Sequence, residues 1–226
     1  MEYRRLGKSD LDISVITLGA WQYGCERYWG KVELNNIYEV INKSVENGIN
    51  IIDTAIGYDD SEIIVGKAIK NIRDKVDILS KGGADPDKMQ RNADLSLKRL
   101  GIDYMDIYLV HYPDLEIPIE YSIEGMVKLK EQGKIRYIGV SNFNADQLER
   151  ASKVTDIICC ESAYNLMWRE IEAGNILDFC IKNNIGMLTY SSLGQGLFTG
   201  KIRSVDDIPT REGDIRQITI LFKGEA

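Results

Sequence analysis

The sequence is poor in the residues that build metal centres and disulfide scaffolds. Its 226 residues include one histidine, His111, and four cysteines, none of which forms a C-x-x-C pair. A zinc site needs several such ligands at close spacing, and small disulfide-dependent domains need many more cysteines. The sequence therefore predicts no metal site, and it predicts that Cys25, Cys159, Cys160 and Cys180 are buried thiols.

Long hydrophobic runs and an excess of basic residues are also lacking. No stretch approaches the ~20 apolar residues of a membrane-spanning helix, and the amino terminus lacks the apolar segment of a secretory signal. Lys and Arg number 28 against 35 Asp and Glu, a net charge of -7, whereas phosphate binding favours a basic surface. We therefore expect a soluble, cytoplasmic protein with neither a membrane nor a nucleic acid as its partner.

The sequence does contain a regular alternation of apolar runs and helical patterns. Hydrophobic residues make up 44% of it, enough for a sizeable core. Strands are predicted at residues 15–19, 49–54, 76–80, 105–110, 136–140, 156–160 and 185–190. Amphipathic patterns predict helices at 33–47, 61–70, 87–100, 119–132, 145–152 and 170–183. A hairpin of residues 3–5 and 13–14 is expected to cap one end of the fold.

Two α/β architectures fit this alternation, a doubly wound open sheet and a (β/α)8 TIM barrel. A barrel gathers polar functional residues at the carboxyl ends of several strands. Such residues follow the second to the seventh predicted strand: Asp53-Thr54, Lys81, His111, Ser141-Asn142, Glu161 and Tyr190-Ser191-Ser192. Consecutive strands deliver these groups to a common axis only in a closed or nearly closed barrel. We therefore predict one domain over residues 1–226, a TIM barrel that is incomplete, with about seven β/α units.

Asp53, Tyr58, Lys81 and His111 form a candidate catalytic group. An unpaired ammonium at a buried barrel mouth is costly, so Lys81 needs a partner, which Asp53 can supply. Tyr58 is predicted to lie against Lys81, whose charge would lower the pKa of the phenol from about 10 toward neutrality. Such a tyrosine can give a proton to a developing alkoxide, while His111 orients the carbonyl oxygen or relays the proton.

Each of these residues taken singly has an ordinary interpretation, as a satisfied core histidine, a packed tyrosine or a surface lysine. Independent placement would not bring all four to one mouth, and their joint order therefore favours catalysis. A Schiff-base lyase with Lys81 as the nucleophile is a further hypothesis. The expected pairing of Lys81 with Asp53 and Tyr58 argues against it.

Five motifs in order resemble the aldo-keto reductase family. They are DTAIGYDDSE at 53–62, LSK at 79–81, SLKRLGIDYMD with HYPD at 96–114, GKIRYIGVSNF at 133–143 and SSLGQGL at 191–197. The resemblance runs from about residue 3 to about residue 225. It implies a TIM-barrel reductase that moves hydride between a nicotinamide cofactor and an aldehyde or ketone, without a metal.

The resemblance also implies roles for individual residues. Tyr58 would be the acid/base, Lys81 and Asp53 its tuning pair, and His111 the group that orients the carbonyl. The implied cofactor-binding residues are Trp21, Asp53, Ser141, Asn142, Glu161, Tyr190, Ser191, Leu193, Gln195, Gly196 and Lys201. Of these, Ser141, Asn142 and Glu161 would hold the nicotinamide carboxamide, Tyr190 would stack on the ring, and the loop from Ser191 with Lys201 would bind the pyrophosphate. The family usually has glutamine at the Glu161 position, and a carboxylate can accept a hydrogen bond from an amide but cannot donate one.

The family pattern normally continues with a seventh helix, an eighth strand and an eighth helix. Residues 213–216 and 222–225 still resemble a family loop over the barrel mouth, and we expect the last unit to be missing. That part normally grips the adenosine end of the cofactor, including the 2′-phosphate. The resemblance therefore favours NADP(H), with weak binding, although the residues that separate NADP from NAD are absent. The open barrel edges also predict self-association.

Two questions stay open at the level of sequence. A non-catalytic relic or regulatory barrel that binds nucleotide poorly is an alternative to the reductase. Trp21, Tyr23, Trp29 and Tyr112 form either an aromatic pocket for the apolar body of a substrate or part of the core.

Overall fold

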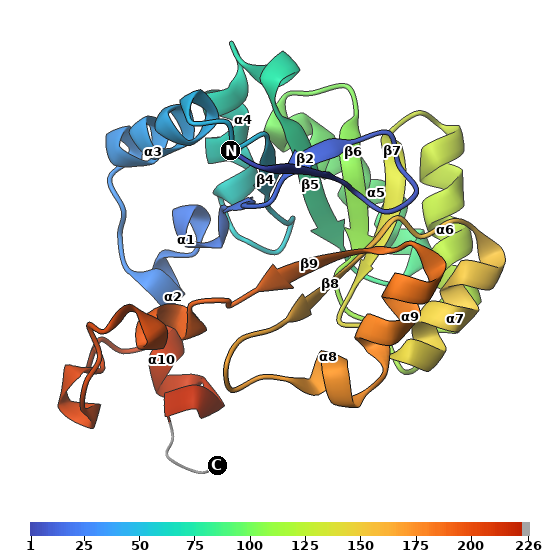
Figure 1. Cartoon of the computed structure of the whole chain (residues 1–226). Coiled ribbons are helices and arrows are strands. Elements are labelled where there is room, and N and C mark those ends of the chain that lie inside the picture. Colours follow the sequence, from blue (N-terminus) through green and yellow to red (C-terminus); the bar gives the residue numbers. More distant parts are fainter. Residues whose placement is uncertain (223–226) are drawn as a thin grey trace.

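A curled sheet of seven parallel strands organises the computed structural model, which describes residues 1–222 (Figure 1). The strands pair in chain order: β3 Leu18–Gly19, β4 Ile51–Asp53, β5 Asp77–Gly82, β6 Met105–Val110, β7 Ile135–Ser141, β8 Cys159–Ala163 and β9 Gly186–Tyr190. Among the described residues, β3 and β9 form the two free edges. The predicted barrel architecture is confirmed as an open half-barrel, and residues 223–225 of the expected mouth loop lie outside the described part.

Helices cover the outer face of this sheet, as expected where parallel strands are joined by crossover connections (Figure 1). The longer helices are α3 Leu34–Glu46, α4 Ser61–Ile69, α5 Pro86–Leu100, α6 Ile119–Glu131, α7 Ala145–Val154 and α9 Ile176–Asn183. Short helices are α1 Trp21–Gly24, α2 Glu26–Trp29, α8 Glu170–Ala173 and α10 Ile215–Ile218, with 3-10 turns at Arg73–Lys75, Gly194–Thr199, Val205–Asp207 and Ile220–Phe222. Within residues 1–222, no helix combines the length and apolar character needed to cross a membrane.

The first strand is much shorter than the predicted 15–19. Val15 and Ile16 are 48% and 55% exposed, and the Val15 amide donates to the Glu2 carbonyl at 3.0 Å. These two apolar residues therefore extend the amino-terminal hairpin, and only Leu18 and Gly19 pair with β4. Tertiary pairing, rather than the apolar run, decides where this strand begins.

The sixth predicted strand, 156–160, is displaced along the chain. In the structure β8 runs through Glu161, which pairs in register with Ser141 of β7. A charged residue inside a buried strand escapes prediction from hydrophobic pattern. Here Glu161 faces the ammonium of Lys81, which stabilises the carboxyl inside the barrel.

The predicted helix at 170–183 is two helices. Asn175 adopts φ +58, a left-handed conformation that ends one helix and begins the next. The described part of the expected mouth loop contains the short helix α10 and adds no strand to the sheet. Arg211 ties this region to α2, since its Nη1 donates to the carbonyl of Arg27 at 2.8 Å.

The amino-terminal hairpin closes the far end of the half-barrel, as predicted. Strands β1 Tyr3–Arg5 and β2 Asp12–Ser14 pair antiparallel, and Leu6, Leu11 and Ile13 pack on the inward-facing residues of the sheet. The turn residue Gly7 has φ +52, and a Cβ there would lie 2.2 Å from the Ile158 carbonyl oxygen. Only glycine fits this close approach. The larger part of the core lies between sheet and helices, and all four cysteines are buried and unpaired, as predicted.

An ion-pair network anchors the start of the sheet. Asp106 on β6 is buried and accepts hydrogen bonds from Arg73 at 2.7 Å, from Arg136 at 3.2 Å and from the Ile78 amide at 2.8 Å. Lys134 and Asp94 form a second pair, in which the aspartate side chain is 56% exposed. The two pairs differ in burial and therefore in their expected contribution to stability.

Asp106→Ala is expected to lower the free energy of unfolding by about 3 kcal/mol or more, because it leaves buried donors without a partner. Asp94→Ala, which breaks only an exposed pair, is expected to cost less than about 1 kcal/mol. Urea denaturation of both variants measures the difference. Equal losses in the two variants would show that the buried network does not stabilise the sheet.

Candidate active site

The structure brings the four predicted catalytic residues together at one mouth of the half-barrel. Asp53 ends β4, Lys81 lies near the end of β5, and His111 follows β6. Tyr58 lies on the connection between β4 and α4. The neighbouring order of β4, β5 and β6 places these side chains side by side, because parallel strands end at the same edge of a sheet.

Lys81 is the centre of this group. Its side chain is 0% exposed, and its Nζ forms a hydrogen-bonded ion pair with Asp53. The same nitrogen lies 3.4 Å from the Tyr58 hydroxyl, 3.3 Å from the Thr54 carbonyl oxygen and 3.5 Å from Oε2 of Glu161. Burial opposes the charge of Lys81, but Asp53 and Glu161 outweigh it and hold its pKa above the ordinary value. The pairing of Lys81 with Asp53 is as predicted and argues against Lys81 as the nucleophile of a Schiff-base reaction.

The prediction that the pKa of Tyr58 is lowered is wrong for the protein without bound cofactor. Burial raises the pKa of Tyr58 above its ordinary value; Lys81 acts in the opposite direction, and Asp53 and Glu161 add to the rise. The contact of Tyr58 with Lys81 is as predicted, but desolvation of the phenol is the larger effect. Tyr58 is therefore a protonated phenol beside a cation, which is the form that a general acid needs.

His111 lies against Tyr58. Their ring centroids are 5.6 Å apart at an interplanar angle of 79°, and the His111 ring also stacks on Tyr112 at 4.9 Å. Burial, with the charge of Lys81, lowers the pKa of His111 to about 4. The imidazole is thus neutral at neutral pH and keeps one N–H donor for an oxygen in the cavity.

Glu161 is the second carboxyl beside Lys81. It is 4% exposed, and its Oε2 makes no hydrogen bond. Burial and the neighbouring Asp53 raise the pKa of Glu161 to about 8, while Lys81 acts in the opposite direction. The raised pKa favours the carboxylic acid form, which can donate a hydrogen bond as an amide does.

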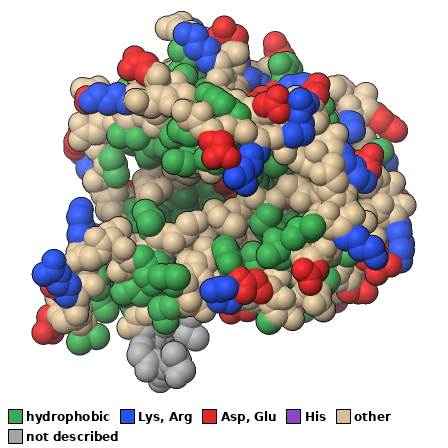
Figure 2. Space-filling view, in the orientation of Figure 1, with side chains coloured by type: hydrophobic (Ala, Val, Ile, Leu, Met, Phe, Trp, Pro, Cys, Tyr) green, Lys and Arg blue, Asp and Glu red, His purple; other side chains and the backbone are tan. Residues whose placement is uncertain are grey.

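One large cavity contains the mouth of the half-barrel, with a volume of about 1440 Å³. Figure 2 shows the hollow on this face of the molecule, with hydrophobic side chains around it. All the predicted cofactor-binding residues except Lys201 line it: Trp21, Asp53, Ser141, Asn142, Glu161, Tyr190, Ser191, Leu193, Gln195 and Gly196. The cavity is thus wide enough for a nucleotide and carries the predicted polar groups on its wall.

Two polar atoms of the wall support the fit of a hydrogen-bonding ligand. Oε2 of Glu161 and Oε1 of Gln195 are buried without a hydrogen-bond partner, and buried polar atoms of a folded protein are normally paired. Gln195 and Ser191 both have φ +54 in the loop after β9. The residues present therefore fit a ligand with both hydrogen-bond donors and acceptors, such as the carboxamide of a nicotinamide.

Asn142 and Tyr190 are joined by a hydrogen bond on the wall of the cavity. The Asn142 amide donates to the His111 carbonyl at 2.9 Å and to Ser141 Oγ at 3.0 Å, and its oxygen accepts from the Tyr190 hydroxyl at 2.8 Å. Asn142 therefore holds three neighbouring wall residues in position. Its φ of +61 is one that asparagine tolerates better than most residues.

The four aromatic residues whose role the sequence left open all line the cavity: Trp21, Tyr23, Trp29 and Tyr112. Trp21 lies 5.9 Å from the Tyr58 ring and 5.3 Å from the Trp29 ring. Tyr28 and Trp168 also belong to the wall and were not singled out by the sequence. The signal that could have found Trp168 is an aromatic residue in the long connection after a barrel strand.

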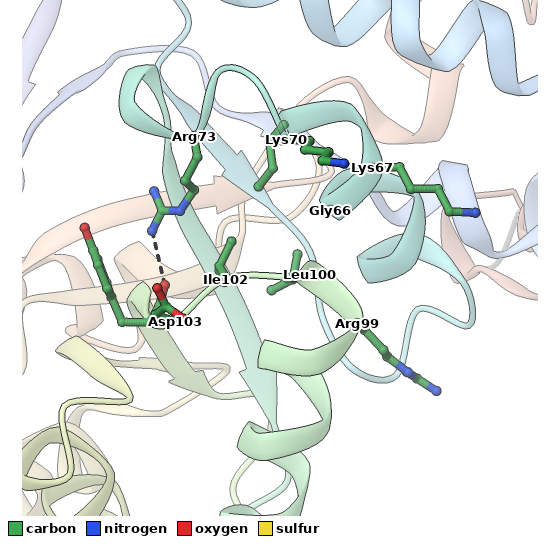
Figure 3. Close-up of a pocket in the computed structure, with 11 residues that line it drawn as sticks. Gly66, Lys67, Lys70, Arg73, Arg99, Leu100, Ile102 and Asp103 are labelled. Atoms are coloured by element: carbon green, nitrogen blue, oxygen red, sulfur yellow. Dashed lines mark hydrogen bonds between the residues drawn. The ribbon is translucent and has the colours of Figure 1, made fainter.

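A second, smaller cavity lies at the opposite end of the sheet, before β5 and β6, with a volume of about 410 Å³. Lys67, Lys70, Arg73 and Arg99 line it, but the charged ends of Lys67 and Arg99 point away from Arg73 (Figure 3). Arg73 is engaged with the Tyr104 carbonyl and with a buried aspartate. These cations do not converge on one ligand. Within residues 1–222, no group of three or more His, Cys, Asp or Glu residues is placed to hold a metal ion.

The sequence profile of the Aldo/keto reductase family matches residues 15–218, nine-tenths of the chain. The chain belongs to the aldo/keto reductase family. The resemblance seen in the five motifs is thereby confirmed.

Two curated members of the family show how much of a relative this aldo/keto reductase spans. It is 39% identical to the aldo-keto reductase YhdN of Bacillus subtilis (strain 168) over 89% of this chain and 65% of the relative. It is 33% identical to the NADH-specific methylglyoxal reductase of Escherichia coli (strain K12) over 97% of this chain and 74% of that protein. The chain thus spans just under two thirds of the length of the first relative.

A solved structure shows the same fold. The glycerol dehydrogenase from Gluconobacter oxydans superposes with a TM-score of 0.88 at 30% identity, over 99% of this chain and 73% of that one. The open half-barrel of this aldo/keto reductase therefore corresponds to the greater part of a family barrel.

Proposed function

We propose that this chain is an NADP(H)-dependent carbonyl reductase in which Tyr58 is the general acid. The observation that supports the proposal is the buried contact of Lys81 with Tyr58, at 3.4 Å, and with Asp53, at the floor of the large cavity. An ion pair with a purely structural role gives no reason for a phenol to lie beside the buried ammonium. A reaction that leaves negative charge on the tyrosine oxygen gives such a reason, because the ammonium stabilises that charge.

The proposed reaction adds two electrons and two hydrogen nuclei to the carbonyl group. The nicotinamide cofactor, when bound, supplies a hydride to the carbonyl carbon. Tyr58 gives its proton to the carbonyl oxygen, and Lys81 stabilises the phenolate that remains. His111, as the neutral imidazole, donates its N–H to the same oxygen and orients it. Asp53 keeps Lys81 charged and in place.

The substrate class follows from the wall of the cavity. Aromatic side chains surround the mouth beside Tyr58, which suits an aldehyde or ketone with an apolar or small body. The E. coli relative, named for methylglyoxal, is specific for NADH by its name. NADPH and NADH must therefore both be tested.

The test of the function is oxidation of NADPH, and of NADH, with a panel of aldehydes and ketones including methylglyoxal. We expect turnover with at least one carbonyl compound, and quenching of protein fluorescence on addition of the reduced cofactor. Binding without turnover, or no binding at all, would instead support a relic or regulatory barrel.

The free edges of the sheet carry a proposal about assembly. Within the described residues, β3 and β9 have no neighbour on one side, and open edges of this kind pair with other chains. A polypeptide of these 226 residues is therefore expected to self-associate and to melt at a temperature that depends on its concentration. Light scattering and thermal melts at several concentrations measure this. A monodisperse monomer with a concentration-independent melt would contradict it.

A further inference from the structure

Two carboxyl groups share one ammonium at the floor of the cavity. Lys81 contacts Asp53 on β4 and Glu161 on β8, and its side chain is completely buried. Asp53 has the hydrogen bond, whereas Oε2 of Glu161 lies 3.5 Å from the nitrogen and has no hydrogen-bond partner. With both carboxyls ionised the cluster carries one net negative charge, and with a proton on Glu161 it is neutral.

The glutamine that the family usually has at position 161 does not ionise, so it could not change the charge of the cluster in this way. The cluster is buried, so its net charge acts through a medium of low effective dielectric constant. Glu161 also lines the large cavity, as do Asn142 and Tyr190. A ligand in the cavity therefore experiences the charge of the cluster directly.

The other titratable groups around Glu161 keep one protonation state near neutral pH. Burial raises the pKa of Tyr58, Tyr190 and Cys159 above their ordinary values. Burial lowers that of His111 to about 4. Asp53 and Lys81 are held as an ion pair. Glu161 is buried with its Oε2 3.5 Å from the Lys81 nitrogen and without a hydrogen bond, and burial with the charge of Asp53 raises its pKa, so it is the group of this cluster expected to lose a proton as the pH rises.

We propose that Glu161 makes the cavity select between the oxidised and the reduced form of the nicotinamide cofactor. The inference rests on the proposed function, which puts the nicotinamide in this cavity. The oxidised ring is cationic and the reduced ring is neutral. An ionised Glu161 therefore stabilises the oxidised form, and a protonated Glu161 removes that preference. The protonation state of Glu161 thereby decides, at a given pH, how strongly the cavity prefers the oxidised cofactor over the reduced one. This preference in turn favours one direction of the reaction.

The test is the ratio of two dissociation constants, that of NADPH divided by that of NADP+, measured by calorimetry between about pH 6 and pH 9.5. Both forms carry the same phosphates, so titration of the phosphates and of groups that bind them cancels in the ratio. We expect the ratio to rise about tenfold across this range, an effect that one unit charge at several ångströms supplies. Measurement of the NADH and NAD+ pair gives the same ratio without the 2′-phosphate.

Two variants separate the effect of Glu161 from a general effect of buried acids. Glu161→Gln is expected to give a ratio that stays constant with pH. Glu62 is a matched control, because it is also buried but faces Ser80 and Arg99 behind the sheet. Glu62→Gln is expected to keep the rise seen in the wild type.

The outcomes distinguish this inference from the proposed function. A constant ratio in the wild type, with both forms bound, would overturn the selection by Glu161 and leave the reductase intact. Failure of both forms to bind would overturn the proposed function and the inference with it. If Glu161→Gln does not fold, the wild-type ratio and the infrared carboxylic-acid band of isotope-labelled glutamate across the same pH range decide the question. A band that persists unchanged to pH 9.5 would also overturn the inference.

Discussion

Tyr58→Phe is expected to abolish carbonyl reduction while leaving cofactor binding nearly unchanged. The hydroxyl lies 3.4 Å from the Lys81 nitrogen and faces the cavity. It is needed only when charge develops on the substrate oxygen, so its loss should lower kcat and not the affinity for cofactor. General acid catalysis contributes roughly 10²–10⁴-fold, which is the expected loss.

The measurement is kcat with the best carbonyl substrate, beside the dissociation constant of NADPH. Tyr28→Phe is the matched control, because Tyr28 lines the same cavity and packs on Trp21 at 5.8 Å. This control is expected to keep most of the activity. A Tyr58→Phe variant that retains more than about a tenth of the wild-type kcat would refute the assignment of the general acid.

Lys81→Met is expected to reduce kcat by a similar factor and also to move the pH dependence of the reverse reaction. Alcohol oxidation needs the Tyr58 phenolate, so its rate rises as pH approaches the pKa of Tyr58. Burial raises that pKa and Lys81 opposes the rise. Without the cation the pKa is higher still, so the rising limb of the profile should shift to higher pH.

The variant must be shown to fold, because it leaves Asp53 and Glu161 buried without their cation. Circular dichroism and a thermal melt establish this, with Lys67→Met on the exposed surface of α4 as the control substitution. An unchanged pH–rate profile for alcohol oxidation in folded Lys81→Met would show that Lys81 does not tune Tyr58.

The hydrophobic pattern alone determined most of the secondary structure. The strand at 105–110 is predicted to the residue, and the helix at 61–70 differs from α4 by one residue. Buried parallel strands are continuous apolar runs, and glycine or proline marks their ends, so these elements have a local signal. The strand through Glu161 lacked that signal, because it carries a buried carboxyl whose charged neighbour, Lys81, is distant in sequence.

The position of the candidate site was predictable from the sequence because polar residues follow successive strands. That order placed Asp53, Tyr58, Lys81 and His111 at one mouth, and the structure brings them together there. The sequence by itself thus indicated the family, the order of the strands and the residues that gather at this mouth. Each of these depends on residue type and spacing along the chain.

Only the tertiary structure decided the charge state of that site. Lys81 lowers the pKa of Tyr58, as residue types alone suggest, but the depth of burial reverses the net direction. Likewise Glu161, expected only to bind the cofactor, lies 3.5 Å from the Lys81 ammonium, and burial with the charge of Asp53 raises the pKa of its carboxyl. Desolvation and the distances between charges depend on which strands become neighbours and how deeply each side chain is buried, and the order of residues along the chain does not contain these quantities.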